Sequence, residues 1–432
     1  MHSSSPVDPT SVYLAALFNH LNQADFPYAV MRNYKSLPDS ANGSDLDILV
    51  PSGKGKETEL LLRSAAKEAG GTIIGVARTA GFFKINAFGE SPLEPGSWWG
   101  LRVDVSVALK FKGAAEILSD SVLRDRLVKH RGIPVLPKDI ASVLGVLKEA
   151  LYNESIPHRY LGGAQKAISE NREQLMQDLS PLGMASFQKF AEICEYSSAE
   201  KGIHKKLKQL KFLTLTNALS KRPVRTVSGW LCFNTSRIFR LFAPPGKIIA
   251  VTGGDHPVRV ETINSIRPVI DTATHGDYVT VDFCPATVGD DDGTSPKAGN
   301  KNELSVPSST KAVRVLIGYL VKYWFSYRLF IARSPSVIIF NRHPIEWNRD
   351  VLRSTPMLIR WLLYLLRQLA PKPHSTLLID DLPAQGSGGQ FNNEQQVADK
   401  ITDSKDVDLP TLGNFYGHKL LRQFSIVLQR IQ

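Results

Sequence analysis

The chain has 432 residues, of which 43% are hydrophobic, and it carries a formal net charge of +11. That length exceeds what one hydrophobic core supports, so we expect two or more domains, and the hydrophobic content excludes wholesale disorder. The three cysteines, Cys194, Cys232 and Cys284, lie far apart and form no CxxC pair. This spacing gives no support to a disulfide framework or a structural zinc site and favours a reducing compartment.

Neither a signal peptide nor a membrane-spanning segment is expected. Residues 1–8 are polar and no apolar core follows them. Lys or Arg interrupts the two most apolar stretches, 315–329 and 357–366, and both are shorter than the about 20 apolar residues that cross a bilayer. We therefore expect a cytoplasmic protein.

Residues 1–112 predict a small mixed α/β domain. Apolar residues from Leu14 to Leu21 recur at the i, i+3, i+4, i+7 spacing of a helix with one buried face, and Ser11 is the expected N-cap. Further along the chain, apolar runs and glycine stops predict one more helix and five strands. The predicted strands are 28–31, 45–50, 72–76, 82–88 and 101–107, and the predicted helix is 57–69.

Three further segments follow this domain. We expect a mainly helical extension over 113–200, a basic linker over 201–245, and a second α/β domain over 246–432, with Pro244-Pro245 as a natural boundary. In the second domain the expected strands 247–252, 337–340 and 376–379 alternate with long helical runs, which implies a parallel sheet. The polar stretches 289–309 and 384–408 are expected to be mobile loops.

Two aspartates alternate with apolar residues in the segment Asp45-Leu46-Asp47-Ile48. Since side chains of a strand alternate between faces, both carboxylates point to one side, about 7 Å apart, and suit Mg²⁺. Asp104 alternates with valines in the same way, so an adjacent strand would bring it to the same site. Three carboxylates can hold two Mg²⁺ ions and support phosphoryl transfer. The competing interpretation is chance, because an Asp-x-Asp pattern arises about once in a chain of this size.

This arrangement resembles the nucleotidyltransferase superfamily, which includes small-molecule nucleotidyltransferases and polymerase-beta-like enzymes, over roughly residues 10–107. The resemblance implies that Asp45, Asp47 and Asp104 carry the metals, two Mg²⁺ ions, and that a nucleoside triphosphate is the substrate. In that family a Gly-Gly or Gly-Ser pair upstream of the aspartates binds the phosphates.

The expected glycine pair is absent from its usual place, which holds Arg32-Asn33-Tyr34 instead, while Gly43-Ser44 directly precedes Asp45. Arg32, Gly43 and Ser44 are therefore the candidate nucleotide-binding residues, with a surface role as the alternative for Arg32. The sequence from Val30 to Val50 is also similar to that of a group of bacterial proteins associated with surface-polysaccharide loci.

The sequence of residues 246–255 is typical of a strand that leads into a Walker A loop. From about residue 246 to residue 432 the chain resembles thymidylate-kinase-like P-loop proteins. Arg259 stands where the phosphate-binding Lys belongs, and Val260 where the Mg²⁺-binding hydroxyl belongs. Asn341 replaces a strand-borne acid, and 386–408 offers two lysines where a lid would bring arginines. We predict a domain retained for its shape without kinase chemistry. The alternative is that Arg259 binds a nucleotide without turnover.

The basic linker contains no acidic residue between Lys201 and Gly254. Its lysines and arginines are interleaved with leucines and aromatic residues, which is typical of a helix on an anionic membrane surface over 201–242. A core helix with a solvated basic face is the competing interpretation, and it predicts that Trp230, Phe233 and Phe239 are buried. A nucleic-acid partner is not expected, because no recognised binding module accompanies the charge.

Two functional hypotheses follow. The first is a Mg²⁺-dependent nucleotidyltransferase acting on a small molecule or glycan precursor, with an inactive kinase-like domain. The second is a non-enzymatic assembly or regulatory protein of surface-polysaccharide biosynthesis, peripheral to the inner membrane. Intact carboxylates favour the first hypothesis, and Arg32-Asn33 in place of the glycine pair favours the second.

Overall fold

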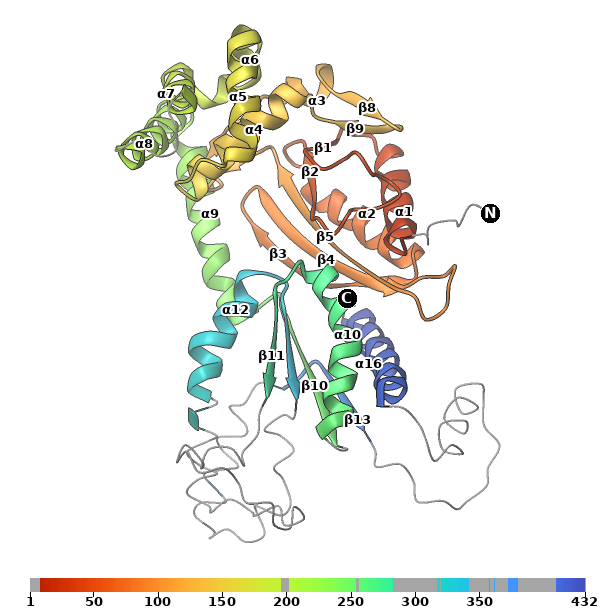
Figure 1. Ribbon diagram of the computed structural model, residues 1–432. Coiled ribbons are helices and arrows are strands. Elements are labelled where there is room, and N and C mark those ends of the chain that lie inside the picture. The colour runs from red at the N-terminus through yellow and green to blue at the C-terminus, as the bar shows by residue number, and fades with distance from the viewer. Residues whose placement is uncertain are drawn as a thin grey trace, which may run out of the picture. The chain divides into compact units, whose positions relative to one another are not determined.

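The computed structural model describes residues 8–195, 202–253, 256–282, 317–318, 320–341, 357, 361, 372–379 and 409–431. The chain divides into two compact units, Met1–Ala243 and Pro244–Gln432, drawn from red to blue in Figure 1. Both units are α/β. The first is built on a mixed sheet and the second on a parallel sheet, which confirms the predicted fold class.

The first unit is organised around a sheet of seven strands in the order β3-β4-β5-β2-β1-β9-β8. β2 pairs in parallel with β5, and β4 pairs antiparallel with β5. β1 pairs antiparallel with β2 and in parallel with β9. The strands are β1 (Ala29–Val30), β2 (Leu46–Val50), β3 (Gly71–Thr79), β4 (Phe82–Glu90), β5 (Trp98–Val107), β8 (Val128–His130) and β9 (Ile133–Val135).

Helices α1 (Thr10–Asn22) and α2 (Gly55–Glu68) cover one face of this sheet. Their apolar residues form one core with the strand residues that alternate with the aspartates, among them Leu46, Ile48 and Val103. α1 begins at Thr10, whose backbone N–H donates to Asp8 Oδ1 at 2.9 Å. The prediction that Ser11 is the N-cap is therefore wrong, because Ser11 lies inside the first turn of α1.

A second core lies on the opposite side of the sheet and belongs to the helical extension. It joins Ala29, Met31 and Leu49 of the sheet region to buried residues of the helices that follow. These helices are α3 (Ser121–Asp125), α4 (Lys138–Tyr152), α5 (His158–Glu170), α6 (Arg172–Asp178), the short η1 (Ser180–Leu182), α7 (Met184–Glu195) and α8 (Ile203–Lys221). The extension therefore shares a core with the sheet.

The expected helical segment 113–200 also contains strands that its sequence did not predict. β8 and β9 form a hairpin that extends the seven-stranded sheet, and β7 (Ala115–Glu116) pairs with β6 (Lys110–Phe111). These strands are two or three residues long, too short for an alternating pattern to stand out. The expected basic linker consists of α8 and α9 (Pro223–Phe242), which end the first unit.

The second unit contains a four-stranded parallel sheet in the order β11-β12-β10-β13. Its strands are β10 (Lys247–Gly253), β11 (Tyr278–Asp282), β12 (Val337–Asn341) and β13 (Ser375–Ile379), of which β11 was not predicted. α10 (His256–Thr274) and α16 (Leu409–Ile431) pack against each other, and the π-helical turn η3 (Tyr323–Tyr327) continues into α12 (Arg328–Arg333). Across the described residues, no helix has both the length and the apolar character to cross a bilayer.

The Arg259 side chain of α10 is buried and hydrogen-bonded at the carboxyl ends of two strands of this sheet. The side chain is only 2% exposed. Its Nε donates to Asn341 Oδ1 at 2.9 Å, and its Nη1 donates to the Gly253 carbonyl oxygen at 2.7 Å. The two residues that replace a Lys and an acid in the kinase resemblance thus bind each other. Several predicted features lie outside the described residues. These are the rest of the expected loop at 254–255, the residue after Asn341, the expected lid at 386–408 and the predicted mobile loops 289–309 and 384–408.

Because Arg259 is buried and hydrogen-bonded, we expect Arg259→Ala to lower the free energy of unfolding by about 3 kcal/mol. Denaturant unfolding measures this loss, and Arg267→Ala, an exposed position on the same helix, is the matched control. ATP turnover by the wild type that disappears in Arg259→Ala, with stability unchanged, would contradict the structural role.

Candidate functional site

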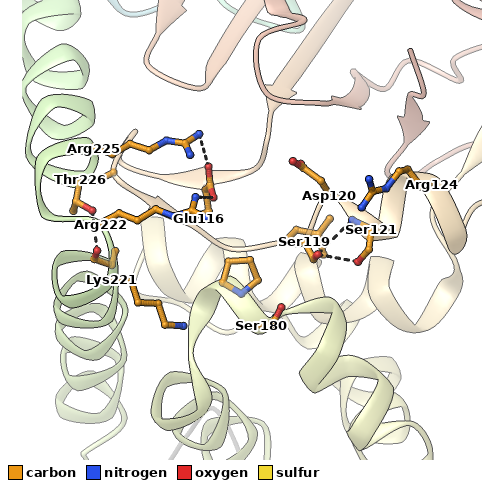
Figure 2. Close-up of a pocket in the computed structure, with 14 residues that line it drawn as sticks. Glu116, Ser119, Asp120, Ser121, Arg124, Ser180, Lys221, Arg222, Arg225 and Thr226 are labelled. Carbon is orange, nitrogen blue, oxygen red and sulfur yellow. Dashed lines mark hydrogen bonds and ion pairs between the residues drawn. The ribbon is translucent and has the colours of Figure 1, made fainter. Parts of the chain in front are cut away.

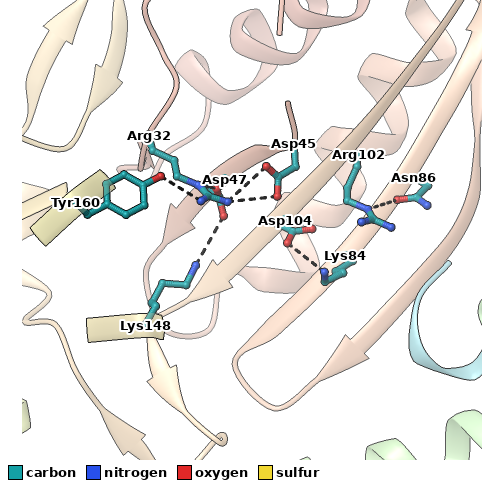
Figure 3. A network of polar contacts seen from close by, with 9 residues as sticks. All are labelled: Arg32, Asp45, Asp47, Lys84, Asn86, Arg102, Asp104, Lys148 and Tyr160. Carbon is teal, nitrogen blue, oxygen red and sulfur yellow. Dashed lines mark hydrogen bonds and ion pairs between the residues drawn. The ribbon is translucent and has the colours of Figure 1, made fainter. Parts of the chain in front are cut away.

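The three aspartates converge on one face of the seven-stranded sheet. β2 and β5 pair in parallel with Asp47 directly opposite Asp104, and Asp45 immediately precedes β2. One ligand oxygen from each carboxylate lies within 4.8 Å of the others. Figure 3 shows the three side chains facing a common space. The structure therefore brings together all three residues that sequence reasoning placed in a metal site.

Burial makes this carboxylate cluster electrostatically costly. Asp47 is 2% exposed and Asp104 is 7% exposed, and like charges directly opposite on neighbouring strands destabilise a sheet. Burial raises the pKa of the Asp104 carboxyl; Lys84 opposes that shift, and the charges of Asp47 and Asp45 add to it. Asp104 Oδ1 is buried and has no hydrogen-bond partner among the described residues.

Basic side chains from three other elements surround the cluster. Arg32, just after β1, pairs with Asp47 through its Nε and with Asp45 through its Nη2 at 3.4 Å. Lys148 of α4 places its Nζ 3.7 Å from Asp47 Oδ1, and Lys84 of β4 places its Nζ 3.4 Å from Asp104 Oδ2. The cluster is therefore enclosed by positive charge.

Arg32 is oriented by more than the carboxylates. Its Nη1 donates to the Tyr160 hydroxyl of α5 at 3.5 Å. Burial opposes the charged guanidinium, but the charge and hydrogen bond of Asp47, with help from Tyr160 and Asp45, leave the Arg32 pKa above its usual value. Arg32 was expected to contact a nucleotide phosphate, and the structure places it against the carboxylates of Asp45 and Asp47.

Gly43 and Ser44 form the turn that leads into β2. Gly43 has φ +69°, a conformation that favours glycine, and the Ser44 N–H donates to the Ala41 carbonyl oxygen at 3.0 Å. This geometry explains why a Gly stands just before the aspartates. A contact of either residue with a nucleotide stays a prediction.

Sequence reasoning missed Lys84, Lys148 and Tyr160. Lys84 pairs in register with Asp104 across β4 and β5, so strand pairing could have identified it. Beyond it on the same face, Arg102 Nε donates to Asn86 Oδ1 at 3.2 Å, and Figure 3 shows this pair extending the polar surface. Lys148 and Tyr160 come from helices much later in the chain, and no local pattern marks them.

The three carboxylates could bind a metal ion. Their oxygens are hard ligands of the kind that Mg²⁺ takes, and the partnerless Asp104 Oδ1 is a donor atom available for such an ion. The neighbouring cations give a second interpretation, in which the cluster is an ion-pair network that needs no metal. Comparison of the chain with protein-family models, with curated proteins and with solved structures found no match.

Metal binding favours the ionised form of Asp104, whereas burial favours its neutral form. This difference allows an experiment to distinguish a metal site from an ion-pair network that needs no metal. A raised carboxyl pKa favours the neutral form, so the ionised Asp104 lowers stability at every pH above the ordinary Asp value of about 3.9. In metal-free protein at pH 7 we expect Asp104→Asn to melt at a higher temperature than the wild type, and the gain should shrink as the pH falls toward 4.

Added Mg²⁺ should reverse this order. At ten times its dissociation constant it would stabilise the wild type by about 1.4 kcal/mol and leave Asp104→Asn unchanged. Asp25→Asn, which removes an exposed carboxylate paired with Lys54, is the control that should respond to Mg²⁺ like the wild type. Equal responses of wild type and Asp104→Asn would show that the cluster binds no metal.

Proposed function

We propose that the first unit is a Mg²⁺-dependent nucleotidyltransferase that acts on a small molecule or glycan precursor. The observation that carries this proposal is the convergence of Asp45, Asp47 and Asp104 on one sheet face. Three carboxylates at this spacing can hold two Mg²⁺ ions, which would activate an attacking hydroxyl and neutralise charge at the transferred phosphoryl group.

Each carboxylate has a distinct role in this proposal. Asp45 and Asp47 would hold the metals. Asp104 would share a metal and help to activate the acceptor hydroxyl.

The cations around the cluster complete the site. A nucleoside triphosphate brings several negative charges to the carboxylate edge, and Arg32, Lys148 and Lys84 supply fixed positive charge there. Arg32 pairs with Asp45 and Asp47 in this structure, and a bound metal would compete with it for these carboxylates and leave its guanidinium available to phosphate oxygens. Fixed charges aimed at the transferred group contribute a large part of phosphoryl-transfer catalysis.

In this proposal the second unit has no kinase activity. Its Arg259 is held by Asn341 and by the Gly253 carbonyl, so the guanidinium is engaged in the protein. A buried, doubly hydrogen-bonded arginine contributes to stability at that position, and we assign unit 2 an architectural role.

The nucleotide-binding step tests the enzyme proposal before an acceptor is known. We expect the full chain to bind at least one of ATP, GTP, CTP, UTP and dTTP in the presence of Mg²⁺, and to lose that binding in EDTA. Asp47→Asn should weaken Mg²⁺-dependent binding at least about tenfold, since it removes a charged metal ligand. Asp125→Asn, at an exposed helix end, is the control. Titration calorimetry that finds no Mg²⁺-dependent nucleotide binding would rule out the enzyme.

The second candidate function is a non-enzymatic assembly or regulatory protein of surface-polysaccharide biosynthesis, at the cytoplasmic surface of an anionic membrane. Two observations support it. Arg32 pairs with both Asp45 and Asp47 and so competes with any metal ion there, and α9 carries exposed apolar side chains. The apolar residues Val224, Val227, Leu231 and Ile238 recur at helical spacing and are all exposed, so they form one stripe along α9.

The other face of α9 is packed against the first unit. A Cβ on Gly229 would lie 2.2 Å from the Gly113 carbonyl oxygen, so the helix approaches that loop closely only because residue 229 is glycine. Thr226, near Gly229 on the helix, is buried. Of the three aromatic residues that a core helix would bury, Phe233 is half-buried, while Trp230 is 48% exposed and Phe239 is 70% exposed, so two of the three favour a surface role. An exposed apolar stripe in a segment without acidic residues fits an anionic bilayer.

Vesicle co-sedimentation at low salt tests the membrane role. We expect the full chain to pellet with vesicles that contain anionic phospholipid. Replacing Lys205, Lys206 and Lys208 of α8 with Glu should abolish most of that binding, because each lysine contributes about 1 kcal/mol near an anionic surface. Leu231→Asp should also reduce it.

A second triple variant with the same change in net charge is the control. It distinguishes attraction of the α8 lysines to the anionic surface from an effect of net charge alone. The exposed lysines Lys56, Lys67 and Lys166, changed to Glu together, alter the net charge equally but lie outside α8 and α9. Equal losses in both triple variants, or no wild-type protein in the pellet, would contradict membrane docking by this segment.

A further inference from the structure

A cavity of about 580 Å³ lies where the α8–α9 corner meets η1 and the residues around α3, all within the first unit. Figure 2 shows Lys221, Arg222 and Arg225 along one side, and Arg124 with the hydroxyls of Ser119 and Ser121 along the other. The volume falls in the range of small-molecule sites. None of its lining residues belongs to the carboxylate cluster.

The charges around this cavity are unbalanced. Glu116 accepts from Arg222 Nη1 at 3.0 Å and pairs with Arg225 Nη2 at 2.9 Å, and Lys110 Nζ lies 3.8 Å away. Three cations therefore share one carboxylate. Burial is the main cause that lowers the pKa of Lys110; Glu116 and Asp120 oppose that shift, and the positive charge of Arg225 adds to it.

Two more cations line the cavity without such a partner. Within the described part of the chain, no carboxylate lies within 4.0 Å of Arg124 or Lys221. Asp120 is the other acidic residue among the described lining residues. The fold thus gathers cations from α3, α8 and α9 around one hollow, although like charges repel one another at short range. A bound anion would relieve that repulsion.

We propose that this cavity binds the phosphate groups of a small molecule such as a diphosphate. Arginine forks recognise phosphate oxygens through paired N–H donors, and the neighbouring serine hydroxyls add further donors. The volume of this open cavity suits a small ligand rather than a duplex nucleic acid. This assignment is independent of the proposed nucleotidyl transfer, and it gives a role to part of the acid-free segment that the carboxylate site leaves unexplained.

Inorganic pyrophosphate in EDTA is the direct probe, because the carboxylate cluster has no Mg²⁺ under that condition. Titration calorimetry of the full chain should show one binding site. Arg124→Ala and Lys221→Ala should each weaken binding at least about tenfold, as expected for the loss of a charge-assisted contact. Both side chains are exposed, so these variants should melt like the wild type.

Two controls decide whether the binding is local. The variant Lys205→Ala with Lys208→Ala removes two exposed cations of α8 outside the cavity, and it should retain wild-type affinity. Asp104→Asn should also retain it, which separates this site from the carboxylate cluster. An equal loss in the α8 control would assign the binding to general surface charge, and the absence of pyrophosphate binding by the wild type would overturn the proposal.

Discussion

The parallel pairing of β2 with β5 brings two buried carboxylates face to face, and much of the first unit is arranged around that contact. The register places Asp47 opposite Asp104, while the residues between them on each strand enter the α1–α2 core. A slip of either strand by one residue would turn the aspartate of that strand into the apolar core. The apolar pattern therefore holds the acidic residues in place, and the cost of their mutual repulsion requires positive charge nearby.

That positive charge comes from segments distant in sequence. Arg32 follows β1, Lys84 lies on β4, and Lys148 lies on α4 of the helical extension. The extension shares a core with the sheet through Ala29 and Leu49, so the same packing that buries its leucines also positions Lys148. The site and the helical extension consequently form one structural unit, and the extension cannot be treated as an appendage.

The predictable part of this site is the part that lies on strands with strict alternation. Asp45, Asp47 and Asp104 each stand beside apolar residues that must face a core, and this constraint alone predicts their shared face. Arg32 was recognised as a candidate, but its contact with the carboxylates depends on the path of the chain after β1. Lys148 and Tyr160 could not be predicted, because helix packing across the sheet brings them to the site.

The acid-free stretch after residue 200 shows how one compositional signal divides among different structural roles. Leu207 and Leu210 of α8 enter the extension core, while Arg222 and Arg225 turn toward Glu116 at the helix corner. Farther along α9, Gly229 permits close packing on one face and leaves Leu231 and Ile238 in solvent on the other. Composition predicted an anionic partner, but only the helix geometry separates the cavity lined by cations from the exposed apolar stripe of α9. Because those surfaces lie on different faces of α9, one helix can serve both without competition.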